Sequence, residues 1–396
     1  MRSRPWWHAC AARLEPDIGP GRFGAAPLFS GARELRLTAT NPKPTIPAFE
    51  AATSFSMIFP VLGLQAPLTF WCCRAVTELV ARSRGQARVF HADGAGDLLR
   101  NILSADTPAV ATSSRPDNLM RQALLASGRR FILSAAQPQA SIEHLIGNGA
   151  APLDATRGVL ADLAALYGLV AANKDGIVTQ DDVLRDAAGT VSRIARRLAL
   201  ECSPEDAGAI ADAISSALVP TAPGAVAPSS IDREDQAAVA GAVDSLTTAL
   251  SDGRYERLVA TRRFFTETAT GGAPLEPIDA TGRNRLLIYG PFISLPAGDW
   301  TAHCVYSFSP GLVGTPMTVD VIHFVGGFTE LARTSFVVTS AGRFDVDVRF
   351  AHTEPSATLE IRLFSEKAIF DGTISLGYVE FRRTLRAGNA SASDEF

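Results

Sequence analysis

The sequence predicts two folded parts in series, an α/β part with a mostly parallel sheet and, after it, an antiparallel β-sandwich. Between residues 57 and 219, short apolar runs alternate with segments of helical period, which is typical of a sheet covered by helices. From residue 281 to residue 385, apolar and polar residues alternate one by one, with turn residues about every ten positions, which is typical of a sandwich. With 396 residues the chain is long enough for two hydrophobic cores.

The α/β part is expected to follow a regular order of strands and helices. Its short apolar runs predict strands at Ile58–Leu62, Ala87–Phe90, Pro108–Ser113, Phe131–Ala135 and Ile177–Thr179. Helical periodicity predicts helices at Thr69–Ser83, Asp97–Ser104, Asp117–Ser127, Asp154–Leu169 and Asp186–Leu200. Gly128 is a stop signal for the third of these helices, and Asp154 is a residue type that can cap the fourth.

Four further segments differ in composition from the two folded parts. Residues 1–56 have no periodicity, so we expect either a disordered tail or a stretch outside the natural protein, whose translation would then begin at Met57. Residues 220–230 read PTAPGAVAPSS and predict a linker. A helix from Ile231 to about Ser251 and a turn-rich connector are expected within residues 231–280, and a disordered tail in residues 386–396.

The sandwich prediction for residues 281–385 depends on seven strand-like runs. They read LLIYGPFISL, DWTAHCVYSF, MTVDVIHFV, ARTSFVVTS, GRFDVDVRF, TLEIRLFS and SLGYVEFRR. In the fifth run Phe344, Val346 and Val348 alternate with charged residues, which indicates one buried and one wet face. No helical pattern interrupts these residues, so an all-β fold is expected.

Composition excludes several classes of function. A net charge of −4 gives no electrostatic reason to expect binding to nucleic acid. The apolar run Ile58–Phe70 is shorter than the roughly 20 residues of a membrane span and contains two prolines, so no span is expected. The five cysteines are scattered and the six histidines isolated, which indicates reduced thiols, no zinc site and a cytoplasmic location. The pattern favours no particular oligomeric state.

Three segments of the α/β part carry a resemblance to a known family. Val178–Ala187, followed by the helix Val191–Leu200, is similar in shape to a segment V-x-Y-E-D-L-x-x-D-P that precedes a helix. Phe131–Ser141 is similar to a strand that ends in R-D-P with a serine after it, and Phe59–Trp71 to a strand followed by the loop G-x-x-R-S-G-T-T-W. Together these segments resemble bacterial sulfotransferases that use phosphoadenosine phosphosulfate.

This resemblance implies a nucleotide site and at the same time implies that the site has diverged. Gly63, Thr69 and Ser141 are the residues that would contact the cofactor. The basic loop residue and the loop glycine are replaced in Ala66-Pro67-Leu68, and the arginine that would meet the 3′-phosphate is Ala136. Pro67 removes a backbone N–H that such a loop needs for phosphate binding. We therefore expect a non-catalytic or divergent domain, and we assign it neither a cofactor nor a catalytic residue.

Other interpretations of the α/β part stay open. It could be an unrelated α/β layer protein, or the whole chain a pure protein-interaction module. It could also be an active sulfotransferase or other transferase on a saccharide or lipid acceptor, which would use phosphoadenosine phosphosulfate. That last interpretation requires Arg74, Arg115, Arg129 and Arg130 to converge at the strand ends.

The sandwich carries a second resemblance. Tyr289 to Trp300 contains Leu295-Pro296-Ala297-Gly298-Asp299-Trp300, which is similar to the L-P-x-G-x-W/Y corner of jelly-roll carbohydrate-binding modules. Aromatic rings beside polar groups bind sugars, so the resemblance implies a glycan site. Its candidate residues are Tyr289, Asp299, Trp300, Tyr306, Arg343 and Tyr378. Aromatic residues in strands are also frequent core residues, which is the alternative for each ring. The combined expectation is a protein of bacterial polysaccharide metabolism that binds a glycan or another small molecule.

One further pattern invites a metal interpretation. With Gly176 at the sixth position of a calcium loop, Asn173, Asp175 and Asp182 fall on ligand positions. Position one would be Ala171, however, and the bidentate glutamate would be a shorter aspartate. An N-K-D-G turn before a strand explains the same residues without a metal. We therefore expect no metal site.

Overall fold

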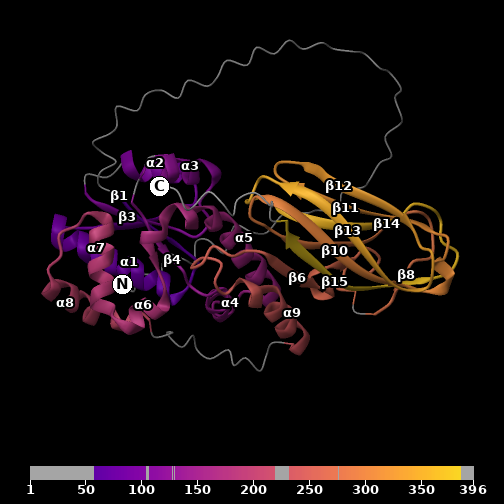
Figure 1. Cartoon of the computed structure of the whole chain (residues 1–396), viewed down its shortest axis with the longest axis horizontal. Coiled ribbons are helices and arrows are strands. Elements are labelled where there is room, and N and C mark those ends of the chain that lie inside the picture. Colours follow the sequence, from indigo (N-terminus) through magenta and orange to yellow (C-terminus); the bar gives the residue numbers. More distant parts are fainter. Residues whose placement is uncertain are drawn as a thin grey trace, which may run out of the picture. The chain divides into compact units, whose positions relative to one another are not determined.

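The fold was analysed in a computed structural model, which describes residues 58–103, 107–126, 128, 130–218, 232–274 and 276–384 (Figure 1). The two expected tails and the expected linker lie outside these residues. An α/β part with a parallel sheet precedes an antiparallel β part, as the sequence predicts.

The α/β part contains a five-stranded sheet in the order β2-β3-β1-β4-β5. Every pairing in it is parallel. The strands are β1 (Ile58–Gly63), β2 (Arg88–His91), β3 (Ala109–Ser113), β4 (Ile132–Ser134) and β5 (Ile177–Val178). All five lie within a residue or two of the predicted runs. β1 occupies the centre, and its residues after Ile58 are buried, because it is covered on both faces.

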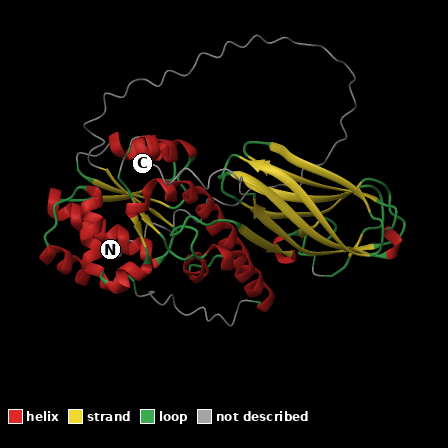
Figure 2. Ribbon diagram, in the orientation of Figure 1, coloured by secondary structure: helices red, strands yellow, loops and turns green. Residues whose placement is uncertain are grey.

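Helices flank both faces of this sheet (Figure 2). They are α1 (Pro67–Arg84), α2 (Ala95–Leu103), α3 (Asn118–Ala126), α4 (Pro138–Gly147), α5 (Pro152–Val170), α6 (Gln180–Arg185), α7 (Ala187–Leu198) and α8 (Pro204–Ile214). Gly128 takes φ +58° just after α3, as a stop signal requires. α8 is absent from the predicted elements, although Ser203 caps it by accepting a hydrogen bond from the backbone of Asp206.

α5 is the core helix of the α/β part. It begins at Pro152 with Ala151 as the N-cap residue, so the prediction that Asp154 caps it is wrong; Asp154 lies in the first turn. Proline is well suited to this first position, because the N–H it lacks would have no partner in the helix. The segment Pro152–Gly176 is long and apolar enough to cross a membrane by length and composition, but two-thirds of its apolar window is buried inside the fold.

The β part consists of two antiparallel sheets. Sheet B has the order β13-β10-β15-β6 with β8 beside β15, and sheet C the order β12-β11-β14-β9-β7. The strands are β6 (Arg257–Thr261), β7 (Thr266–Glu267), β8 (Ile278–Asp279), β9 (Leu286–Ile293), β10 (Gly298–Phe308), β11 (Pro316–Phe324), β12 (Phe328–Val337), β13 (Gly342–His352), β14 (Thr358–Ser365) and β15 (Thr373–Arg383). The last seven are the predicted runs.

Residues 231–280 contribute more to the sandwich than a helix and a connector. The predicted helix is shorter than expected, α9 (Arg233–Val243), with a 3₁₀ turn after it. β6 and β8 pair with β15, and β7 pairs with β9. The sandwich therefore begins at Arg257.

Sheet B has an inner face in the core and an outer face toward solvent. On β10 the inner residues are Trp300, Ala302, Cys304, Tyr306 and Phe308, all buried. The outer residues are Asp299, Thr301, His303 and Ser307, which are partly or fully exposed, and Val305, which is buried. This alternation follows from the pleat, which points successive side chains to opposite faces.

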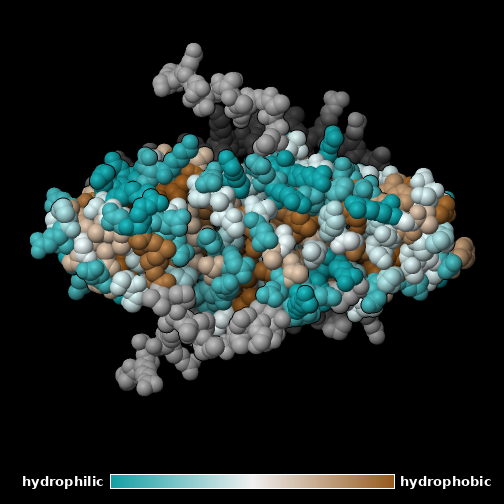
Figure 3. Space-filling view, turned by 60° about the horizontal axis from the view of Figure 1, so that its bottom comes forward, coloured by the Kyte–Doolittle hydropathy of each residue, from teal (hydrophilic) through white to brown (hydrophobic). Residues whose placement is uncertain are grey.

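Polar residues cover most of the described surface in the view of Figure 3, and apolar residues appear there as small separate patches. The turn between β11 and β12 holds exposed apolar side chains. Phe324 and Phe328 have ring centroids 5.3 Å apart there, and Phe328 is 72% exposed.

We predict that Leu163→Ala in α5 lowers the free energy of unfolding by about 2–5 kcal/mol, because Leu163 is fully buried and its truncation leaves a cavity. Chemical denaturation followed by helical circular dichroism measures this change. Leu184→Ala in α6 is the matched control, because Leu184 is 68% exposed and should cost less than about 0.5 kcal/mol. Equal losses in the two variants would contradict the assignment of α5 as the core helix.

Candidate functional site

The β1–α1 loop brings together Gly63, Thr69 and Ser141, the three residues that would contact a nucleotide according to the resemblance to sulfotransferases. Thr69 donates its hydroxyl proton to Leu64 O at 2.5 Å, and Ser141 donates to Gln65 O at 3.0 Å. A Cβ on Gly63 would lie 2.8 Å from Thr69 Oγ1 and 2.7 Å from Ser134 Cβ, so only glycine fits there. The three residues thus surround the carboxyl end of the central strand, where ligands bind in open α/β sheets.

The side-chain hydroxyls around this loop are hydrogen-bonded to other atoms of the protein. The hydroxyls of Thr69 and Ser141 both bind loop carbonyl oxygens, and Thr69 Oγ1 also contacts Ser134 Oγ at 3.0 Å. Pro67 occupies the first position of α1. The arrangement therefore fixes the loop through side-chain contacts.

The arginines that an active transferase would need do not converge around this loop. Of those that the structure describes, Arg74 is exposed on α1 and Arg130 precedes β4, at the opposite edge of the sheet. Only Arg115 follows the carboxyl end of a strand, and it is bound to Asp162 and Gly158 O. Arg129 lies outside the described residues.

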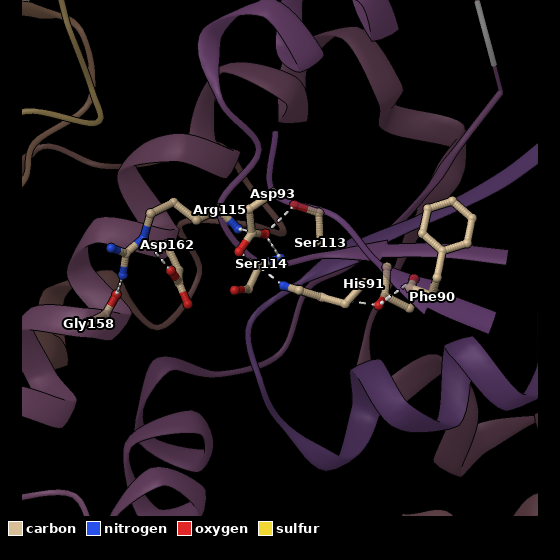
Figure 4. A network of polar contacts seen from close by, with 9 residues as sticks. Phe90, His91, Asp93, Ser113, Ser114, Arg115, Gly158 and Asp162 are labelled. Atoms are coloured by element: carbon tan, nitrogen blue, oxygen red, sulfur yellow. Dashed lines mark hydrogen bonds and ion pairs between the residues drawn. The ribbon is translucent and has the colours of Figure 1, made fainter. Parts of the chain in front are cut away.

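A second polar site lies at the carboxyl ends of β2 and β3 (Figure 4). Asp93 Oδ1 accepts hydrogen bonds from Ser113 Oγ at 2.7 Å and from the backbone N–H groups of Ser114 and Arg115 at 3.2 and 3.1 Å. Asp93 Oδ2 lies 3.0 Å from His91 Nε2. One carboxylate therefore joins the ends of two neighbouring strands.

The sequence-based reasoning missed this network, although a signal for it exists. His91 is the last residue of β2 and Asp93 lies two residues after it; Ser113 is the last residue of β3, and Ser114 and Arg115 follow it. Polar residues at the carboxyl ends of neighbouring parallel strands meet on the same side of the sheet.

The pKa values of the ionisable groups in this network are shifted in different directions. Burial raises the pKa of Asp93, but hydrogen bonds from His91, Ser113 and the backbone outweigh burial and hold its pKa well below the ordinary range. Burial lowers the pKa of His91, and the hydrogen bond and charge of Asp93 outweigh it, so the net shift is upward. Burial also raises the pKa of Asp162, against the opposing charge of Arg115, whose Nε lies 2.8 Å away.

The sandwich separates the six glycan candidates into three groups. Trp300 and Tyr306 are 1% and 2% exposed, and Trp300 Nε1 donates to Pro296 O at 3.0 Å. Both rings point to the inner face of sheet B, so they are core residues and cannot stack on a sugar from solvent. Tyr289 lies on β9 in sheet C, where its ring packs at 5.7 Å against Phe292.

Tyr378, Arg343 and Asp299 share the outer face of sheet B. Tyr378 opposes Val305 across the β10–β15 pairing, and Arg343 opposes Ser307 across the β10–β13 pairing. Hydrogen bonding and charge from Asp345, with a smaller contribution from the Tyr378 hydroxyl, raise the pKa of Arg343. Asp299 is at the beginning of β10, four residues before His303.

His303 and Asp347 complete the surroundings of Tyr378, and the sequence did not select either of them as a glycan residue. His303 Nδ1 lies 2.7 Å from Asp347 Oδ1, its partner in the ladder, and its ring centroid is 6.5 Å from that of Tyr378. A half-exposed aromatic ring with charged and hydrogen-bonding groups on the neighbouring strands is a surface suited to a sugar.

Two of the three residues of the calcium interpretation, Asn173 and Asp182, have other partners. Asn173 donates to Phe131 O at 3.1 Å and accepts from Arg197 at 2.5 Å. Asp182 forms a capping box with Thr179 at the start of α6 and binds Arg193. Among the described residues no group of three or more metal-ligating side chains is found.

No protein family matches the chain, and no curated protein matches it. Among solved structures, mouse sulfotransferase SULT7A1 complexed with PAP is similar over 46% of this chain and 73% of its own, at 8% identity and a TM-score of 0.32. A family 16 carbohydrate-binding module is similar over 33% of this chain and 90% of its own, at 16% identity and a TM-score of 0.21.

An arabinose-bound α-L-arabinofuranosidase, MgGH51, is similar over 34% of this chain at 14% identity and a TM-score of 0.24. This chain spans about a quarter (27%) of the length of that enzyme. At such scores the fold assignment rests on the strand order of the protein itself.

We predict that Asp93→Asn lowers the pKa of His91, because burial is then opposed only by the charges of Asp162 and Asp97. Imidazole NMR titration measures the shift. In the wild type, the stabilisation from this pair is present below about pH 6.5 and is lost as the pH rises through the higher folded-state pKa of His91; at acid pH it is lost again as Asp93 is protonated. An unchanged His91 pKa in the variant would show that Asp93 does not set it.

Proposed function

We propose that this protein binds glycans through the outer face of sheet B and that its α/β part is a non-catalytic, sulfotransferase-like scaffold. The observation that carries the proposal is the position of Tyr378. Its half-exposed ring lies on β15, and hydrogen-bonding side chains flank it on the adjacent strands. Sugars present apolar ring faces with hydroxyls around them, which is the complement of this arrangement.

Side chains on the outer face of sheet B are held in place by strand pairing and by hydrogen bonds. Tyr378 and His303 are on neighbouring paired strands, and His303 is fixed by Asp347 from the other side. Side chains held in this way lose little conformational freedom on binding, so a larger share of the interaction energy appears as affinity. Tyr289 is a weaker candidate, because the Phe292 ring that packs against it also carries Arg157 at 5.7 Å.

The scaffold assignment is supported by the β1–α1 loop. A phosphate cradle requires free backbone N–H groups and a nearby cation at a helix N-terminus. Pro67 begins α1, and the first basic residue of that helix, Arg74, is exposed in its second turn. Thr69 and Ser141 are bound to loop carbonyl oxygens, which favours a structural use of both hydroxyls.

The proposed setting is bacterial polysaccharide metabolism in the cytoplasm. Four cysteines, at 72, 73, 202 and 304, are free thiols, which fits a reducing compartment. The polysaccharide setting rests on the resemblance of the two parts to sulfotransferases and carbohydrate-binding modules.

We predict that native gels containing a polysaccharide ligand retard the full chain. Tyr378→Ala should weaken this binding about thirtyfold, because truncating an aromatic hot spot costs about 2 kcal/mol. Dextran, galactan, xylan, polygalacturonate and dextran sulfate form the panel. Tyr378→Phe, which keeps the ring, is the matched control and should retain most of the retardation.

Two outcomes of the panel would count against this proposal. Retardation by none of the five polymers would refute the glycan-binding function. Retardation that is lost in Tyr289→Ala but kept in Tyr378→Ala would place the site on sheet C instead.

We further predict that adenosine 3′,5′-bisphosphate at millimolar concentration does not change the melting temperature. A functional nucleotide site occupied at a hundred times its dissociation constant would stabilise the fold by about 2.7 kcal/mol, which is several degrees. A thermal-shift titration with adenosine 5′-monophosphate as the control measures this. A saturating rise with the bisphosphate alone would overturn the scaffold assignment and favour the active transferase.

A further inference from the structure

The outer face of sheet B carries three arginines in one row, which we call the arginine row: Arg349, Arg382 and Arg257. On β10, Thr301 pairs with Arg349 of β13 on one side and with Arg382 of β15 on the other. Arg382 pairs in turn with Arg257 of β6. The row therefore crosses four neighbouring strands and contains no carboxylate.

Like charges directly opposite each other destabilise a sheet. Here Glu380 in the adjacent row binds both members of the pair Arg382–Arg257, Arg257 through Oε1 and Arg382 through Oε2. The charge of Asp347 acts on Arg382 as well, with a smaller effect than Glu380. Glu380 is 5% exposed, because the two guanidinium groups cover it, whereas the side chains of Arg257 and Arg382 stay 58% and 53% exposed. Each arginine thus keeps N–H groups that face solvent.

Arg349, the third member of the arginine row, is not bound by a carboxylate of any described residue. It is exposed, and the structure gives it no hydrogen bond or ion pair with any described residue. The nearest acidic residue along its own strand and face, Asp347, is bound to His303 at 2.7 Å. Asp345, further along, is bound to Arg343 at 3.0 Å. Asp299 lies in the row beyond, on the far side of Thr301.

The space above Thr301 is the centre of this arrangement. Arg349 and Arg382 are separated by two strand spacings, about 10 Å between their backbones, and the short Thr301 side chain lies between them. Two long guanidinium side chains can meet over such a gap and bind one anion from both sides, and the threonine hydroxyl can donate a third hydrogen bond. Carboxylate and sulfate groups match the planar fork of a guanidinium.

Tyr378 lies on the same face as this gap, four residues from Arg382 on β15. At the rise of a strand this places it about 13 Å away. A ligand that reaches both must be an oligomer with a sugar ring at one point and an anionic group at another.

We infer that the glycan bound by the outer face of sheet B is acidic, with a uronate carboxylate or a sulfate ester held between Arg349 and Arg382 above Thr301. This inference rests on the proposed glycan-binding function and adds its ligand class. The net charge of the chain is −4, so general electrostatic attraction to a polyanion is not expected and a specific site is required.

The experiment compares the full chain in native gels containing dextran or dextran sulfate, which share one backbone, and in gels containing polygalacturonate, which carries carboxylates. We expect stronger retardation by dextran sulfate, polygalacturonate or both than by dextran. The polymer that retards more identifies the anion as a sulfate ester or a carboxylate. Mobility in polymer-free gels corrects for the charge of each variant.

Arg349→Gln and Arg382→Gln remove the charge and keep a polar side chain of similar reach. Each should weaken binding to the acidic polymer about tenfold, the loss of one charge-assisted hydrogen bond. Arg185→Gln is the matched control, because Arg185 is an exposed arginine on α6 outside the sandwich. It should bind the acidic polymer as the wild type does.

The outcomes separate this inference from the function on which it rests. Retardation by neutral polymers that equals or exceeds that by acidic ones refutes the acidic ligand and leaves glycan binding intact. Loss of acidic binding to the same degree in Arg185→Gln as in the row variants shows unspecific attraction and also refutes it. Retardation by no polymer refutes the glycan-binding function itself.

Discussion

The register of β10 against its two neighbours is the constraint on which the functional face depends. β10 pairs residue by residue with β13 along its whole length, from Gly298 with His352 to Phe308 with Gly342. This pairing sends Trp300 and Tyr306 into the core and His303 to the outside. A shift of one residue would exchange these two sets and bury the charges, which is why the hydrophobic pattern fixes the register so firmly.

Burial and charge are distributed differently in the α/β part. There the centre of the sheet is apolar on both faces, and polar groups gather only where strands end. Asp93 uses its carboxylate to hold the turns after β2 and β3 together, while Gly63 lets the β1–α1 loop approach Ser134 closely. Both devices stabilise loops at the edge where an α/β protein would bind a ligand. In this chain the edge is filled mainly by contacts within the protein.

The sequence allowed much of the fold to be predicted, because alternation of period two and buried runs are local signals. The short strands β6, β7 and β8 were missed for the opposite reason. β7 and β8 have two residues each, and their existence depends on partners more than 20 residues away in the chain. α8 carried a local signal in Ser203-Pro204-Glu205-Asp206, a cap followed by proline and acidic residues, which could have been used.

The candidate sites were predicted less completely than the fold. Sequence resemblance selected Gly63, Thr69 and Ser141, and the structure places them around one loop. It also selected aromatic residues without knowing which face each would take, so Trp300 and Tyr306 were included although they are core residues. His303 and the arginine row become visible only when strands are aligned, because their members come from strands that are distant in sequence.

A β-bulge at Gly377 decides which face Tyr378 occupies, because regular pairing of Gly377 would turn Tyr378 inward. In β15 the register shifts opposite Val305 and Tyr306, where Gly377 is the bulged residue and a Cβ on it would lie 3.3 Å from Val305 O. Leu376 before it points inward and Tyr378 after it points outward. In evolutionary terms, the bulge absorbs one inserted residue, so the loss of Gly377 would leave Tyr378 and the residues after it on their present faces. An inserted residue that the strand took up without a bulge would exchange the two faces from that point on, whereas substitutions alter the surface one residue at a time.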